Sequence, residues 1–300
     1  MKTIVIGMLL VGMGNTAIAA GQKPWPKQHN AVVQSSVVSS DVMFGYSYVL
    51  AAADSNQYPI HRFELDLRLA PKEHPLSRKD LTLVHTVGEH MSMLKNSPKS
   101  DVFSVAVPEG WELEYPGLWG VIELEQRYMI QPGKSLSGYI IRASEPPSIR
   151  DFVVGFYSWD FVNNPEDYEY PGRKLRRVGD PDELTTEVNK GIQYLGKTIA
   201  PVKPPEPFTI SSWTARMTAD ALEARKLKWI KNDKNLLEIK KLIATLNTED
   251  RSALAAAVKK IENYVLAEKK KGNLTDESDA LVRINAQYLL HRLESTDVRK

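Results

Sequence analysis

Cysteine is absent from this 300-residue chain. The chain can therefore form no disulfide bond, offers no thiol nucleophile or Cys-based metal site, and has no cysteine to carry an acyl anchor. It also has little net charge, because 39 Lys and Arg residues oppose 37 Asp and Glu residues and leave a formal charge of +2. Nucleic-acid-binding proteins usually carry a strong basic field, so the sequence argues against nucleic acid as a partner.

The common catalytic motifs are missing as well. The chain contains no G-x-S-x-G nucleophile turn, no phosphate-binding loop, no H-E-x-x-H zinc motif and no EF-hand spacing. His85 and His90 form the only close histidine pair, and their spacing of five in a predicted loop does not suit metal ligation. We therefore expect a protein that is not an enzyme and that needs no cofactor.

The first 20 residues have the features of a secretory signal peptide. Lys2 supplies the positive charge, and the apolar run Ile4–Gly14 is too short to span a bilayer. Ala17-Ile18-Ala19 gives a cleavage site of small residues, and the alternative is an N-terminal anchor helix. We expect export to the periplasm or the cell exterior. The lack of disulfides favours a bacterial export route, and no later segment is long and apolar enough to cross a membrane.

The region 102–161 shows the clearest strand pattern. Apolar and polar residues alternate there, for example at Phe103, Val105 and Val107, and a period of two places side chains on opposite faces of a strand. Breaks rich in Pro and Gly follow roughly every 8 to 15 residues, which is typical of sandwiches and barrels. We predict an antiparallel β-sandwich over residues 31–196, immunoglobulin-like or jelly-roll-like, after a flexible lead-in at 21–30.

Two local features of this region can be predicted in more detail. Strands at 46–50 and 60–69, joined by a short polar loop, predict a β-hairpin. Gln131-Pro132-Gly133-Lys134 predicts a type II turn, because Pro fixes φ at the second position and Gly accepts a positive φ at the third.

A proline-rich linker is predicted at 197–207, since four prolines lie between Pro201 and Pro207. From Ser211 onwards Gly and Pro almost vanish. Apolar residues then recur at steps of three and four, which predicts helices at about 212–231, 235–246, 250–271 and 276–294. We expect a small all-α helical bundle over 208–296, with Gly272 ending one helix and Thr275 capping the next.

Residues 235–293 resemble the FIMAH-type helical module that ends many secreted bacterial proteins. The Phe-Ile-Met-Ala-His run that names the module is matched here by Tyr264-Val265-Leu266-Ala267-Glu268, which departs at its last position. The segment 272–277 resembles the Gly-x-Leu/Ile-Thr turn of the module. The resemblance implies an exported accessory protein and brings no catalytic residues.

The front half is similar to exported β-sandwich domains with a Pro-x-Gly-Trp turn, present here at 108–111. Their Ile-x-Pro-Gly-x-Ser-x-x-Gly-aromatic signature is matched by residues 130–139. These are packing and turn signatures, so they imply a fold and a surface-associated role.

Three groups of residues are candidates for binding or chemistry. Exposed aromatic rings could stack on sugars, whereas buried rings would only fill the core. An acidic loop could hold Ca²⁺ through oxygen ligands, or be an ordinary surface loop. Paired glutamates on the central strands could serve a glycosidase, or be solvated charges on polar faces. The aromatic candidates are Trp111, Tyr115, Trp119 and Trp159; the Ca²⁺ candidates are Asp160, Asn163, Glu166 and Asp167; the glutamates are Glu109, Glu112, Glu114, Glu123 and Glu125.

The sequence favours a secreted, non-enzymatic binding, adhesion or scaffold protein. Its partner would be a protein or a cell-surface glycan, recognised through the loops or an edge of the β-sandwich. The alternative is a carbohydrate-active protein, either a glycan-binding module or a glycoside hydrolase.

Overall fold

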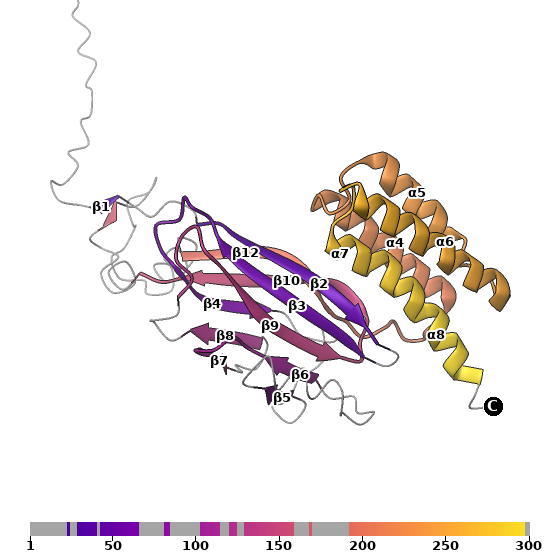
Figure 1. Ribbon diagram of the computed structural model, residues 1–300, viewed down its shortest axis with the longest axis horizontal. Coiled ribbons are helices and arrows are strands. Elements are labelled where there is room, and N and C mark those ends of the chain that lie inside the picture. The colour runs from indigo at the N-terminus through magenta and orange to yellow at the C-terminus, as the bar shows by residue number, and fades with distance from the viewer. Residues whose placement is uncertain are drawn as a thin grey trace, which may run out of the picture.

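The chain is a mixed β plus α protein in which two mainly antiparallel sheets precede the helices (Figure 1). A computed structural model describes residues 23–24, 29–40, 43–65, 81–84, 103–114, 120–124, 129–158, 168–169 and 192–297. The predicted leader at 1–20 lies outside these residues.

The first sheet has five strands, and all its pairs are antiparallel except β5 with β6. In spatial order the strands are β2 (Ala31–Ser39), β3 (Phe44–Ala52), β9 (Ser135–Ala143), β6 (Phe103–Ala106) and β5 (Leu81–Val84). On β3, Tyr46, Tyr48 and Leu50 are buried, as the period of two predicts.

The second sheet also has five strands and is antiparallel throughout. Its order is β12 (Gln193–Pro201), β10 (Pro147–Phe156), β4 (Ile60–Leu65), β8 (Gly120–Leu124) and β7 (Trp111–Glu114). A separate two-residue parallel pair joins β1 (Lys23–Pro24) to β11 (Tyr168–Glu169).

The predicted hairpin between the strands at 46–50 and 60–69 is wrong. β3 belongs to the first sheet and β4 to the second, and the real hairpin partner of β3 is β2. Both strands bury an aromatic face, and the ring centroids of Tyr48 and Phe63 lie 6.2 Å apart across the core. Phe63 also approaches Tyr139 of β9 at 5.8 Å. The two strands therefore face each other instead of pairing side by side.

The predicted turn at 131–134 is confirmed. Gly133 has φ of +73°, and the Lys134 N–H donates to the Gln131 carbonyl at 2.9 Å. A Cβ added at Gly133 would lie 2.1 Å from Oδ1 of Asp54. The positive φ favours glycine here, and any larger residue would also have to displace the Asp54 side chain.

Two predicted boundaries need correction. β12 extends to Pro201 and pairs with β10 along its length, so residues 197–201 are part of a sheet and the linker begins later. The lead-in ends before residue 29, because the buried His29 stacks on Tyr58 and Phe156 at 4.9 and 4.7 Å. Proline content identified the linker, but proline is tolerated at the end of an edge strand.

The helices lie close to their predicted positions. They are α4 (Ile210–Lys226), α5 (Asp233–Ala244), α6 (Arg251–Lys270), α7 (Asp276–Asp279), the π-helical turn η4 (Ala280–Ile284) and α8 (Asn285–Asp297), the last three continuous. Gly272 has φ of +72°, and Thr275 caps α7 with a capping box. These two predictions are confirmed. They could be made from the sequence because helix caps are set by residues adjacent in sequence.

Candidate functional site

The aromatic candidates are only partly described, and Trp111 belongs to the core. Its side chain is 4% exposed and meets Tyr139 edge-on, with ring centroids 4.8 Å apart and planes at 88°. A buried ring of this kind cannot stack on a sugar face. Tyr115, Trp119 and Trp159 lie outside the described residues.

The glutamate candidates are placed by strand register alone. Glu112 of β7 lies opposite Glu123 of β8, and Glu114 lies opposite Val121. Glu109 is exposed in the turn before β7, and Glu125 lies outside the described residues. The backbone register therefore places Glu112 and Glu123 at opposite positions on neighbouring strands.

The Ca²⁺ candidates Asp160, Asn163, Glu166 and Asp167, and the pair His85 and His90, also lie outside the described residues. Within the described ranges, no group of three or more His, Cys, Asp or Glu side chains could hold a metal ion. In the same ranges, no helix is both long and apolar enough to cross a bilayer.

A set of hydrogen bonds between distant residues joins the helices to the sheets. The Ser35 N–H of β2 donates to Oε1 of Glu277 on α7 at 2.9 Å, and both residues are buried. The Asn285 side-chain amide donates to the Pro147 carbonyl of β10, also at 2.9 Å. We call this region, together with Ser148 and Asp220 described below, the helix–sheet contact. Figure 1 shows α7 and α8 beside the end of β2, with α5 farther away.

Aromatic rings surround the helix–sheet contact. Phe44 of β3 lies 6.0 Å from Tyr288 of α8, and Tyr288 lies 5.1 Å from Trp213 of α4. Trp213 is fully buried and donates its indole N–H to the Asn285 carbonyl at 3.0 Å. Apolar packing and hydrogen bonding therefore hold the same helices against the same strands.

The carboxyl group of Asp220 has a strongly shifted pKa at this contact. It lies on α4, and the Ser148 hydroxyl of β10 donates to its carboxylate, with Oγ 2.9 and 3.1 Å from the two oxygens. Burial raises the pKa of Asp220 to about 6, although Arg216, the Ser148 hydrogen bond and Arg150 each act to lower it. A carboxyl group at a junction of elements thus titrates in a mildly acidic range.

Arg216 compensates the Asp220 charge only in part. Its Nε is 3.9 Å from Oδ2 of Asp220, beyond hydrogen-bond reach. Its Nη1 donates to the Lys203 carbonyl at 3.1 Å, and its guanidinium carbon lies 5.0 Å from the Trp213 ring centroid. Nη2 is buried and has no hydrogen-bond partner among the described residues. The Arg216 guanidinium therefore donates to the Lys203 carbonyl and lies over the Trp213 ring, while its Nε is beyond hydrogen-bond distance of the Asp220 carboxylate.

The other notable surface is apolar and lies on the edge strands. β2 and β12 are edge strands of the two sheets and are in contact with each other, with the Ile199 N–H 3.4 Å from the Ser35 hydroxyl. Val32 and Val38 of β2 are 54% and 70% exposed, and Leu195 of β12 is 72% exposed. We call these three side chains the apolar edge.

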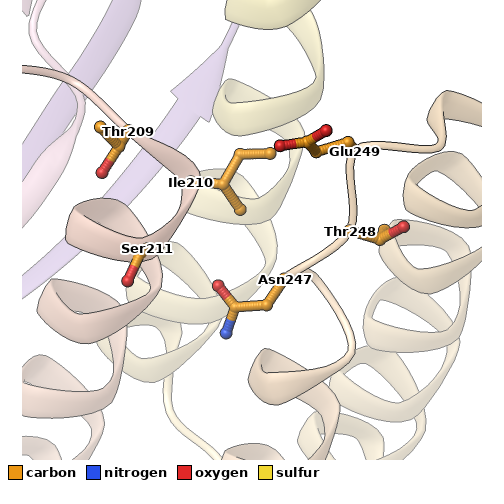
Figure 2. A pocket seen from close by; sticks show the side chains of 6 residues that line it. All are labelled: Thr209, Ile210, Ser211, Asn247, Thr248 and Glu249. Atoms are coloured by element: carbon orange, nitrogen blue, oxygen red, sulfur yellow. The ribbon is translucent and has the colours of Figure 1, made fainter.

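A pocket of about 330 Å³ lies between the start of α4 and the loop that joins α5 to α6 (Figure 2). In Figure 2 the Ile210 side chain points towards Glu249, and Asn247 lies below them. The hydroxyl of Thr214 donates to Oδ1 of Asn247 at 2.9 Å. The pocket lining is formed by Thr209, Ile210, Ser211, Asn247, Thr248 and Glu249. Among the described residues, its lining includes no histidine, cysteine or basic side chain, and Glu249 is the ionisable group there.

The residues of the helix–sheet contact were not identified from the sequence. One signal was available for Asn285, since it is a polar residue in the apolar series Leu281, Ile284 and Tyr288. A buried polar residue in such a series needs a partner. The partner of Asn285 is 138 residues away, and no local pattern reveals it.

Comparison with known proteins does not assign the chain to a family. No protein-family model matches it, and a search of curated proteins finds no match.

Proposed function

We propose that this protein is an exported, non-enzymatic binding or scaffold protein, in which a β-sandwich recognises a partner and a helical bundle is fixed against it. The chain crosses repeatedly from one sheet to the other, and Tyr48, Phe63 and Tyr139 meet between them. This arrangement supports an immunoglobulin-like or jelly-roll-like sandwich.

The helical part is proposed to be a FIMAH-like module. Residues 264–268 lie on α6, and the positive φ of Gly272 and the cap at Thr275 fit the turn of the module. At the position where the run departs from the module, Glu268 accepts hydrogen bonds from the side-chain amides of Asn235 and Asn273 at 2.8 and 2.7 Å. The substituted residue therefore has a structural role of its own.

The observation that carries the proposal is the apolar edge. Proteins usually protect edge strands with charges, bulges or covering elements. The middle of β2 is covered, because Glu277 accepts the Ser35 N–H, whereas Val32 and Val38 on either side of Ser35, and Leu195 of β12, remain exposed. An extended protein segment that pairs with a sheet edge obtains affinity from backbone hydrogen bonds and specificity from such side chains. We therefore place partner recognition on this edge.

The test is binding of the mature chain, residues 21–300, to the envelope fraction of the bacterium that encodes it. Saturable binding is expected, and Leu195→Arg should weaken it at least tenfold because a charge replaces an exposed apolar contact. Leu237→Arg is the matched control, since Leu237 is 56% exposed on α5, away from the edge. No saturable binding, or equal loss in both variants, would contradict the proposal. Binding to a soluble glycan alone would support the carbohydrate-binding alternative.

Export is tested separately by mass spectrometry of the chain expressed in a bacterial host. The mature protein should be found outside the cytoplasm and begin at Ala20 or Gly21. Recovery of the chain only in the cytoplasm, with residues 1–20 retained, would show that the N-terminal segment is not a leader.

A further inference from the structure

Asp220 joins two parts of the molecule that are far apart in sequence. It lies on α4, and its hydrogen-bond donor Ser148 lies 72 residues earlier on β10. The Asp220 side chain is 13% exposed, so water compensates little of its charge. Burying an ionised carboxylate costs free energy unless cationic groups lie within hydrogen-bond distance of it.

The charged groups around Asp220 do not provide that compensation fully. Arg216 on the same helix lies 3.9 Å away and is directed to Lys203 and Trp213. Arg150 on β10 also lowers the pKa of Asp220 through its charge, but less than Arg216 does. Further out, Tyr46 of β3 and Tyr288 of α8 interact with Arg216.

We propose that protonation of Asp220 tightens the helix–sheet contact, so that the helices are held more firmly on the sheets in mildly acidic solution than at neutral pH. The neutral carboxyl group keeps its hydrogen bond to Ser148 and no longer carries a buried charge. Once ionised, the same group favours the open state, in which water solvates it. The proposal goes beyond partner binding, and it does not depend on the proposed function.

The direction and size of the effect follow from linkage. The pKa of Asp220 rises from its ordinary value of 3.8 to about 6 in the folded protein. A raised carboxyl pKa contributes stability that is fully present below pH 3.8 and is lost as the pH rises through 6. With these two pKa values, the opening equilibrium of the contact should be about tenfold less favourable at pH 5 than at pH 7.

The Ser35 N–H is a direct reporter of opening, because its acceptor is Glu277 on the helical side. Its exchange with solvent deuterium is measured on the full mature chain by NMR at pH 5 and pH 7, and corrected for intrinsic exchange. The corrected rate should be about tenfold lower at pH 5. Asp220→Asn removes the titration and keeps a neutral side chain of the same shape, so its corrected rates should be low and equal at both pH values.

Asp233→Asn is the control, because Asp233 is 86% exposed and pairs with Arg225 at the surface. This variant should keep the tenfold difference. Equal corrected rates in the wild-type chain, or a tenfold difference that persists in Asp220→Asn, would overturn the proposal. It would also be overturned if the Ser35 N–H were as protected as the N–H groups inside β3, since the contact would then not open separately.

Discussion

Glu268 is a single residue at which the departure from the motif of the proposed FIMAH-like module has a clear structural reason. The hydrogen bonds from Lys271, Asn273 and Asn235 lower the pKa of its carboxyl group to about 2. Asn235 is buried at the start of α5, while Glu268 lies near the end of α6. The carboxylate therefore connects the two helix ends, because one of its oxygens accepts hydrogen bonds from both amide groups. A histidine nitrogen could not accept two hydrogen bonds in this way.

Glu268→Ala should destabilise the protein by about 1–3 kcal/mol at pH 7, because it leaves the buried Asn235 amide with one acceptor fewer. A lowered carboxyl pKa contributes stability that is present above the ordinary value of 4.5 and lost as the pH falls towards 2. The difference between wild type and variant should therefore shrink at pH 3. Urea unfolding at both pH values measures it. Glu238→Ala, which removes an exposed pair with Lys241, should change stability by less than about 0.5 kcal/mol.

Lys228 occupies a backbone conformation that suits glycine. It follows α4 with φ of +63°, and side chains are disfavoured in this left-handed region. Lys228→Gly should stabilise the protein by about 0.5–1 kcal/mol. Lys240→Gly, in the middle of α5, should destabilise it by about 1 kcal/mol. If thermal or urea unfolding gave the same sign for both variants, the conformation at Lys228 would not be strained.

At the scale of the element, β12 depends on one close contact with its neighbour. Gly196 lies opposite Phe152 of β10, and a Cβ at Gly196 would lie 2.4 Å from the Phe152 ring. Phe152 is itself held by Phe63 and Tyr194 at 6.0 and 6.1 Å. The ring covers the glycine and has little room to move.

Gly196→Ala should therefore destabilise the protein by about 1–3 kcal/mol through overpacking. In the double variant with Phe152→Leu, the added methyl group should cost less than it does in the wild-type background, because the smaller side chain leaves space. Urea unfolding of the two single variants and the double variant forms the cycle. Additive changes would argue against a direct clash between the two positions.

The elements differ in how far their sequences predicted them. The helices and their caps were predicted to within a few residues, because Gly272 and Thr275 act on their immediate neighbours. Alternation identified β3 and β4 as strands, but alternation is the same for strands that pair and strands that face each other. The hairpin was predicted wrongly for that reason. The partners of Ser35 and Asn285 are more than 100 residues away, so the helix–sheet contact could not be inferred from local pattern.

At the scale of the whole molecule, the sheets and helices share one core. Phe44 of β3 packs against Tyr288 of α8 and is 6% exposed. Phe44→Ala should lower the stability of the helices as well as the sheets, by about 3–5 kcal/mol. The measurement is urea unfolding followed by the helical ellipticity at 222 nm. An unchanged midpoint would mean that the helices fold independently of the sheets. Leu222→Ala, at an exposed position of α4, should leave the midpoint nearly unchanged.

The bond from Ser35 to Glu277 also determines the order in which the molecule can be completed. The two residues are 242 positions apart, so the β2 edge lacks its cap during synthesis until α7 has emerged. Contacts of such long sequence separation form late, and an open strand edge favours association between chains. A nascent chain arrested before residue 277 would therefore present an uncapped strand, and escort by a chaperone would matter most during that interval.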